Sequence, residues 1–190
     1  MITPRDLLKA TRDLEFESQR VYSELVEKDW NRPPSRRRLP RALWAFMMLG
    51  FGHIDFVSAL WKGTDKGQSR RMTDFMERYL GMSRRPASMA VKIWRHKLMH
   101  TGEPRKVIDR ATGKTCSWLL HWAHQLPANQ HATTNEQGKE IILQMSLSSF
   151  LADLKIGQRA YLRDLRADKE LDRKFQSFAK SIDKEFFHGY

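Results

Sequence analysis

The sequence predicts a mainly α-helical protein, a helical bundle with a small antiparallel β insert before its last long helices. Through the first hundred residues, and again after residue 147, apolar residues recur at the three- and four-residue spacing of helices that face a core. Between residues 105 and 146 they alternate instead, as in a β-hairpin or meander. A chain of 190 residues with 41% hydrophobic residues can bury a core. We therefore expect a single domain, 1–190.

The first helix is expected to begin at Thr3 and to end near Trp30. Thr3 can cap the helix, and Pro4 suits its first position. The apolar stripe that follows contains Leu7, Leu14, Val21 and Leu25. Residues 31–38 are expected to form a loop. Its arginine side chains are more simply interpreted as solvated than as ligand-binding. These are Arg32, Arg36, Arg37 and Arg38.

The second helix should run from Pro40 to about Trp61 and lie in the core. Its apolar stretch is long enough to need a comparison with a membrane span, but His53 and Asp55 interrupt it. An aspartate at the centre of a span costs about 2.5–3.5 kcal/mol. We therefore expect a buried helix and no membrane. Two glycines within it, at positions 50 and 52, are expected to allow another backbone to approach closely.

Two shorter helices are expected next. A turn from Gly63 to Gly67 precedes the first of them, which Gly81 ends. Its apolar face consists of Met72, Phe75, Met76, Tyr79 and Leu80. Ser83 and Pro86 should start the second, whose inner face consists of Met89, Ala90, Ile93 and Trp94.

The β insert is expected to contain three strands, at 107–108, 115–123 and about 140–145. In the second strand Cys116, Trp118, Leu120 and Trp122 share one face. Core packing is the more common role for such a tryptophan pair, and base stacking is the alternative. A polar loop should lie between the second and third strands. The helical period returns at Leu147, and a final helix carries Leu171, Phe175, Phe178, Ile182 and Phe186.

The composition favours an acidic partner. Lysine and arginine (34) exceed aspartate and glutamate (22), which gives a net charge of +12. A surplus of this size attracts polyanions such as RNA. Cys116 is the single cysteine, which excludes an intrachain disulfide and a thiolate-rich zinc site. The N-terminal residues lack the apolar core of a signal peptide, so we expect a cytoplasmic protein.

The densest chemical segment is 93–105, at the end of the fourth helix. It holds two histidines, three cations and the carboxylate of Glu103. In an ideal α-helix Arg95 and His100 would point about 140° apart. They can converge if the helix unwinds near Met99, which the following glycine and proline favour.

The segment Arg95-His96-x3-His100 resembles the Arg-x4-6-His motif of the HEPN superfamily. The polar residue directly after the arginine and the late position on a helix of a small bundle also fit. The resemblance covers the bundle, residues 4–104 and 147–187, and does not extend to 105–146. It implies a metal-independent endoribonuclease or an inactive relative, of the kind found in toxin–antitoxin, defence and RNA-processing systems. It also implies a homodimer whose two motifs form one site, and an antitoxin-type protein partner.

Metal-free RNA cleavage needs a base, an acid and a cation. Histidine suits proton transfer near neutral pH, and the arginine fork matches phosphate oxygens. We therefore expect His100 to transfer protons, Arg95 to stabilise the phosphate and His96 to assist or orient. No cofactor or metal is expected. The cations expected to bind nucleic acid are Lys97, Arg84, Arg85 and Arg105.

Other interpretations of the motif remain open. Arg95 could cap helix carbonyls or pair with Glu103, and His100 could have no task. His96 and His100 also have the spacing of a zinc pair, but Lys97 opposes a metal there. The histidines at 121, 124 and 131 are expected at the surface. A non-catalytic interaction or dimerisation module, or a nucleic-acid-binding protein, is the alternative function.

Overall fold

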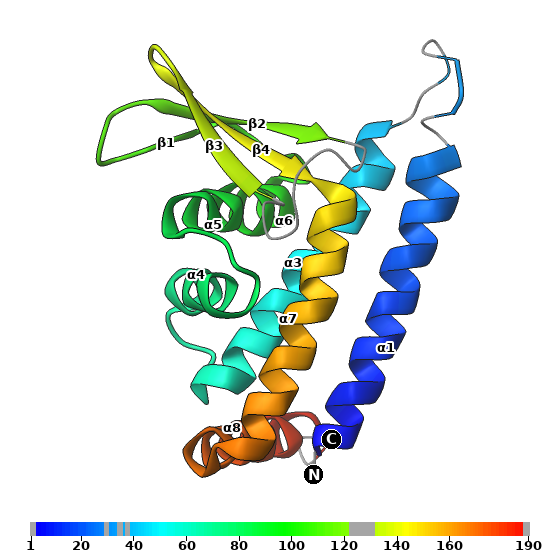
Figure 1. Cartoon of the computed structure of the whole chain (residues 1–190), viewed down its shortest axis with the longest axis vertical. Helices are drawn as coiled ribbons and strands as arrows, with labels where there is room; N and C mark the ends of the chain where they lie inside the picture. The colour runs from blue at the N-terminus through cyan, green and yellow to red at the C-terminus, as the bar shows by residue number, and fades with distance from the viewer. Residues whose placement is uncertain (1–2, 29–30, 34–35, 37–38, 122–131, 188–190) are drawn as a thin grey trace.

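The computed structural model describes residues 3–28, 31–33, 36, 39–121 and 132–187 (Figure 1). Three long helices, α1 (Pro4–Arg20), α3 (Leu39–Lys62) and α7 (Leu147–Ala167), run along the long axis of the molecule. A sheet lies at one end of this axis, and α8 (Lys169–Phe187) crosses the other end. The expected mainly helical fold with a small sheet is confirmed.

The first helix begins as predicted. The Thr3 hydroxyl accepts a hydrogen bond from the Asp6 backbone N–H at 3.3 Å, and the Asp6 carboxylate accepts one from the Thr3 N–H at 2.8 Å. This reciprocal arrangement satisfies two donors at the helix start. After α1 the chain continues as the π-helical segment η1 (Val21–Glu27). The predicted end at Trp30 lies outside the described residues, as do Arg37 and Arg38 of the following loop.

The helix α3 lies at the centre of the core, as predicted. Phe46, Met47, Phe51 and Ile54 are all at most 1% exposed. Within the described part of the chain, this is the one helix long and apolar enough to cross a membrane, through the stretch Leu43–Lys62. More than half of that stretch is buried inside the protein, which is also a property of core helices.

The close backbone approach expected at Gly50 and Gly52 occurs elsewhere. A Cβ at Gly50 would lie 2.7 Å from the Phe150 ring, and one at Gly52 would meet nothing within 4 Å. A Cβ at Gly157 on α7 would lie 2.5 Å from the Tyr79 carbonyl oxygen. The prediction for α3 was therefore wrong about the partner, because α3 packs there against a ring and α7 meets the end of the neighbouring helix.

The helices α4 (Gln68–Tyr79) and α5 (Arg84–Ala90) lie beside the long helices (Figure 1). The helix α4 begins and ends close to the predicted positions, and Gly81 follows it with a positive φ of 65°. The helix α5 begins as predicted after Ser83 but ends at Ala90, so the predicted fourth helix continues in two further segments. The chain then passes through the π-helical segment η3 (Val91–Lys97) and the short helix α6 (Leu98–Thr101).

The sheet is mixed rather than antiparallel. Its four strands are β1 (Val107–Ile108), β2 (Thr115–His121), β3 (Ala132–Gln137) and β4 (Glu140–Ser146), in the order β1-β2-β4-β3. The β1–β2 hairpin is antiparallel as predicted, but β2 and β4 are parallel. Residues 132–137, expected as a polar loop, form an edge strand paired with β4. An edge strand needs only backbone hydrogen bonds to one neighbour, so its polar sequence gave no period-2 signal.

One face of the sheet closes the core over α5 and η3. Ile141, Leu143 and Met145 are fully buried on β4. The Trp118 ring lies 5.1 Å from the Trp94 ring, centroid to centroid, and its indole N–H donates to the Pro104 carbonyl at 3.1 Å. Core packing of Trp118 is thus confirmed, whereas Trp122, His124 and His131 lie outside the described residues.

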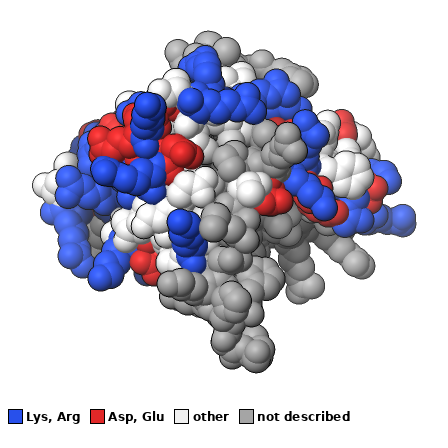
Figure 2. All heavy atoms as spheres, turned by 90° about the horizontal axis from the view of Figure 1, so that it is seen from below, with Lys and Arg blue, Asp and Glu red and all other residues white. Residues whose placement is uncertain are grey.

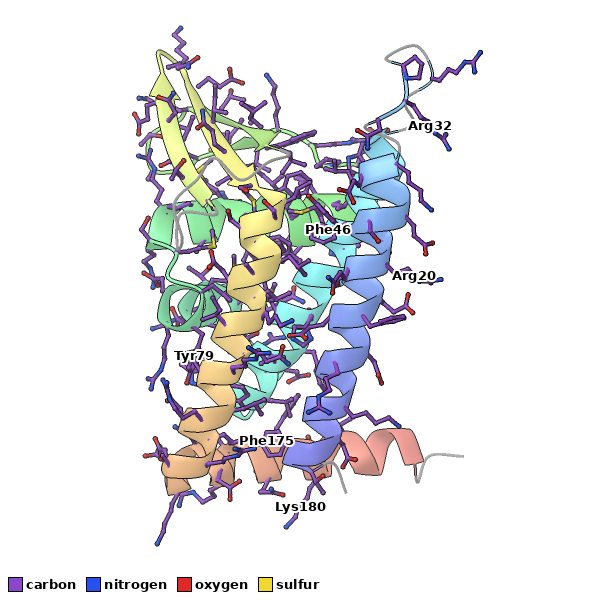
Figure 3. All side chains as sticks on the ribbon, turned by 45° about the vertical axis from the view of Figure 1, so that its right-hand side comes forward. Arg20, Arg32, Phe46, Tyr79, Phe175 and Lys180 are labelled. Carbon is purple, nitrogen blue, oxygen red and sulfur yellow. The ribbon has the colours of Figure 1, made fainter. Side chains whose placement is uncertain are left out.

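The core extends over the whole length of the bundle. Figure 3 shows Phe46, Tyr79 and Phe175 at successive levels between the sheet end and α8, and all three are buried. Arg20 and Lys180, labelled in the same figure, are exposed. The segment 93–105 lies at the sheet end of this bundle, where η3 and α6 contact α3.

Candidate functional site

The motif residues lie on a helix that changes its geometry. Arg95 and His96 belong to η3, and His100 belongs to α6. In a π-helix each backbone N–H bonds five residues back, and such segments occur frequently at functional sites. The expected unwinding at Met99 is wrong, because α6 continues to Thr101 and Gly102 ends it with a φ of 70°. The departure from α-helical geometry lies one turn earlier.

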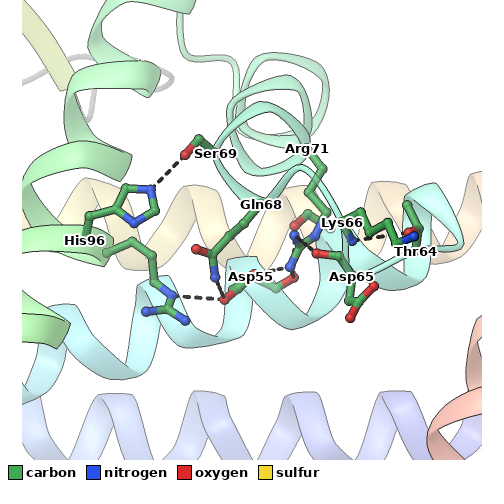
Figure 4. A network of polar contacts seen from close by, with 10 residues as sticks. Asp55, Thr64, Asp65, Lys66, Gln68, Ser69, Arg71 and His96 are labelled. Carbon is green, nitrogen blue, oxygen red and sulfur yellow. Dashed lines mark hydrogen bonds and ion pairs between the residues drawn. The ribbon is translucent and has the colours of Figure 1, made fainter.

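Asp55 is the centre of the polar network beside the motif (Figure 4). Its carboxylate accepts hydrogen bonds from Arg95 Nε at 2.9 Å, from Gln68 Nε2 and from Arg71 Nη2. Arg71 also donates through Nη1 to the Asp65 carbonyl at 2.6 Å. Three elements, α3, α4 and η3, are therefore joined through one carboxylate.

This network is largely removed from water. The exposed side-chain fraction is 7% for Arg71, 14% for Asp55 and 19% for Arg95. Burial lowers the pKa of Arg71, and the Asp55 charge opposes that shift. Two guanidinium groups share the Asp55 carboxylate here, and the charge of the Asp65 carboxylate also acts on Arg71.

The two motif histidines face the same side. Their rings are nearly parallel, with an interplanar angle of 3° and centroids 6.4 Å apart. His96 Nε2 lies 2.7 Å from the Ser69 hydroxyl, and the tautomer decides which of the two donates. Burial is the main cause that lowers the pKa of His96, and the charges of Arg95 and His100 add to it. His96 is therefore neutral at pH 7, whereas the exposed His100 is accessible to solvent.

The motif thus brings Arg95, His96 and His100 to one region, with unequal access to solvent. Arg95 pairs with Asp55 and does not pair with Glu103, so that alternative is wrong. No group of three or more histidine, cysteine, aspartate or glutamate side chains in the described residues could hold a metal ion. The pair of histidines therefore lacks the third ligand that a zinc site needs among these residues.

The four predicted nucleic-acid-binding cations differ in their surroundings. Arg84 donates to Asp74 at 3.1 Å and to Glu77 at 2.6 Å. Arg85 is paired with two carboxylates, those of Glu136 and Asp109. Lys97 and Arg105 are exposed, and within the described part of the chain no carboxylate pairs with either. Only the second two are free to meet an anion without breaking an ion pair.

Sequence reasoning missed Asp55, Gln68, Ser69 and Arg71. Asp55 was considered only as an interruption of an apolar helix, although a carboxylate in such a helix needs a cationic partner. Arg71 carried a similar signal, since it directly precedes the apolar face of α4. Neither signal identifies Arg95 as a partner of Asp55, because the two residues lie 40 positions apart in the chain.

No family model matches this sequence, and neither the curated proteins nor the solved structures contain a significant match.

Proposed function

We propose that the protein is a HEPN-like, metal-independent endoribonuclease that acts as a homodimer. The observation that carries this proposal is the parallel pair of His96 and His100 beside the Arg95 guanidinium. This arrangement provides two proton-transfer groups and a phosphate-binding cation on neighbouring turns. The net charge of +12 supports an RNA substrate.

The chemistry follows from the state of each group. The 2′-oxygen of RNA attacks the adjacent phosphorus, the bond to the 5′-oxygen breaks, and a 2′,3′-cyclic phosphate forms. A base takes the 2′-hydroxyl proton and an acid gives one to the departing 5′-oxygen. In our proposal His100 transfers the proton at the exposed end, and neutral His96 assists as its counterpart, oriented by Ser69. The guanidinium of Arg95, oriented by Asp55, stabilises the charge on the phosphorane.

The proposal predicts a pH dependence of the reaction. Because the pKa of His96 is lowered, its neutral form persists below pH 6.5. The acidic limb of kcat/KM should therefore lie below pH 6.5 if His96 is the base. A limb above that value would assign the base to another group.

One observation favours a second function, a non-catalytic interaction or nucleic-acid-binding module. Arg95 is paired internally with Asp55 and is only 19% exposed, as a structural arginine would be. In that case the motif stabilises the bundle, and the exposed cations bind the partner. An antitoxin-type protein partner is compatible with either function.

The deciding experiment is cleavage of mixed RNAs by the purified protein in EDTA, with detection of 2′,3′-cyclic phosphate ends. His100→Ala and Arg95→Ala should each abolish cleavage. Arg163→Ala is the matched control, since the Arg163 side chain on α7 is 79% exposed and the substitution removes the same charge as Arg95→Ala. Cleavage that survives in His100→Ala would refute the assignment of proton transfer to His100. A folded wild-type protein without cleavage would favour the interaction module.

A further inference from the structure

A groove of about 720 Å³ opens next to the motif histidines. Its walls come from α4, from α5 with η3, and from the β1–β2 hairpin, and Glu136 of β3 also lines it. Ser69 belongs to both sites, because its side chain lines the groove and its hydroxyl lies 2.7 Å from His96 Nε2. Ser69 is thus the point at which the lining of the groove contacts His96.

The cations that line the groove fall into two groups. Arg84 and Arg85 are held by carboxylates, as described above. Arg70 and Lys92 are exposed, and no hydrogen bond or ion pair joins either side chain to another described residue. The hydrogen bond from Thr112 is the main cause that lowers the pKa of the Asp109 carboxyl, and the charge of Lys92 adds to it. Arg70 and Lys92 are thus the two groove cations that can bind an anion without breaking an existing pair.

The remaining lining is partly apolar. Met89 and Val107 contribute to it, together with Ile108, which is 67% exposed. None of the described residues that line the groove is aromatic. Such a surface can cover ribose and base edges but offers no ring for base stacking. Recognition there would depend on phosphate charge and tolerate different base sequences.

We infer that this groove binds the phosphates of a single-stranded RNA, with Arg70 and Lys92 as the contacts, and guides that strand to His96 and His100. The inference rests on the proposed function. A flexible single strand suits this site because its backbone can follow a groove and its 2′-hydroxyl can reach an in-line position. A duplex has a rigid A-form backbone, and its 2′-oxygens are held away from that position. Arg84 and Arg85, in contrast, hold the walls of the groove in place through their carboxylate partners.

The test measures binding of a fluorescent single-stranded 2′-O-methyl RNA by anisotropy over a range of salt concentrations. This probe cannot be cleaved, so the wild-type protein can be used. Each phosphate contact on a single strand contributes about 0.7 to the slope of log K against log salt. The double variant Arg70→Ala/Lys92→Ala should therefore bind more weakly, with a slope reduced by about 1.4. Circular dichroism and thermal melting check that the variant is folded.

A matched control removes the same charge at the other end of the molecule. Figure 2 shows that lysine and arginine side chains also gather on the face seen from below, where α8 lies. Arg173 and Lys180 line a shallow pocket on α8, so Arg173→Ala/Lys180→Ala lowers the net charge equally. This control should leave the slope unchanged. An equal loss in both double variants would overturn the inference, because binding would then follow total charge.

Two other outcomes would also overturn it. The wild-type protein could fail to bind the single strand, or it could bind duplex RNA or a polyglutamate peptide more tightly than the single strand. Cleavage of ordinary RNA by the same variants separates this inference from the proposed function. If cleavage needs His100 but binding does not change in the Arg70→Ala/Lys92→Ala variant, the nuclease proposal stands and the groove inference is refuted. If the strand binds through the groove but no RNA is cleaved, the groove binds RNA and the nuclease proposal is refuted.

Discussion

Replacing Asp55 with asparagine tests whether the polar network stabilises the fold. The carboxylate is the shared acceptor for Arg71, Arg95 and Gln68. Asp55→Asn keeps the shape and one acceptor oxygen but removes the negative charge. The Arg71 guanidinium, whose side chain is 7% exposed, would then remain buried without its counter-ion.

The expected cost follows from the loss of this counter-ion. Removal of one partner of a buried ion pair typically destabilises a protein by about 3–5 kcal/mol. Arg71 retains its bond to the Asp65 carbonyl, and asparagine can still accept one hydrogen bond. We therefore expect a loss of about 2–3 kcal/mol, somewhat below this range. For a chain of this length, that loss lowers Tm by roughly 4–12 °C.

The measurement is urea unfolding followed by circular dichroism, with calorimetry for Tm. Asp74→Asn is the control, because Asp74 also pairs with two cations, but Arg84 and Lys62 are 61% and 39% exposed. Surface pairs contribute about 0–1 kcal/mol, so the control should lose less than about 1 kcal/mol. An Asp55→Asn variant as stable as this control would refute the argument that the buried charge needs its partner.

Three further predictions concern packing, pH and the thiol. Gly157→Ala should destabilise the protein by about 1–3 kcal/mol, since the new Cβ would lie 2.5 Å from the Tyr79 carbonyl oxygen. Gly52→Ala should stabilise it by about 0.5–1 kcal/mol, because a Cβ there meets nothing within 4 Å. Urea midpoints that move equally in the two variants would contradict this pair of predictions. Burial lowers the pKa of His53 to about 4, below its unfolded value of about 6.5, so stability is present above pH 6.5 and is lost as the pH falls toward 4. Between pH 7 and 5 the wild-type protein should therefore lose about 2 kcal/mol more stability than His53→Gln, and equal pH slopes in the two proteins would argue against a neutral imidazole at this position. The Cys116 thiol is buried, which raises its pKa. A disulfide reagent at pH 8 should therefore label this thiol only after the protein unfolds. Rapid labelling of the native protein would show instead that the groove wall opens.

The helices were predictable because their signals are local. The Thr3 cap with Pro4 and the apolar face of α4 each lie within a few turns of sequence, and the structure confirms both. Strand β3 carries no such signal. Its pairing depends on β4, which has the alternating apolar residues, and on an edge position that accepts polar side chains. The parallel pairing of β2 and β4 likewise depends on the strand order β1-β2-β4-β3, in which β3 lies at the edge of the sheet, and alternation does not encode that order.

The candidate site was predictable only in part, for a similar reason. The motif gave Arg95, His96 and His100, but the state of Arg95 depends on Asp55, 40 residues earlier. Before the fold is known, a carboxylate within an apolar helix indicates that some cation must approach it. The identity of that cation follows from how α3, α4 and η3 pack.

The distribution of usable charge shows why a basic composition cannot locate a binding surface. In the sequence, Arg84 and Arg85 resemble Arg70 and Lys92, since all four are cations on or near helices. In the structure, the first pair is bound to carboxylates, one of which, on Glu136, lies 51 residues from Arg85. An anion that approaches Arg85 would have to displace those carboxylates, while Arg70 and Lys92 need only lose water. The affinity for RNA should therefore depend more on Arg70 and Lys92 than on the paired arginines around them. For this reason, variants of Arg70 and Lys92 test binding in the groove more directly than variants of Arg84 or Arg85.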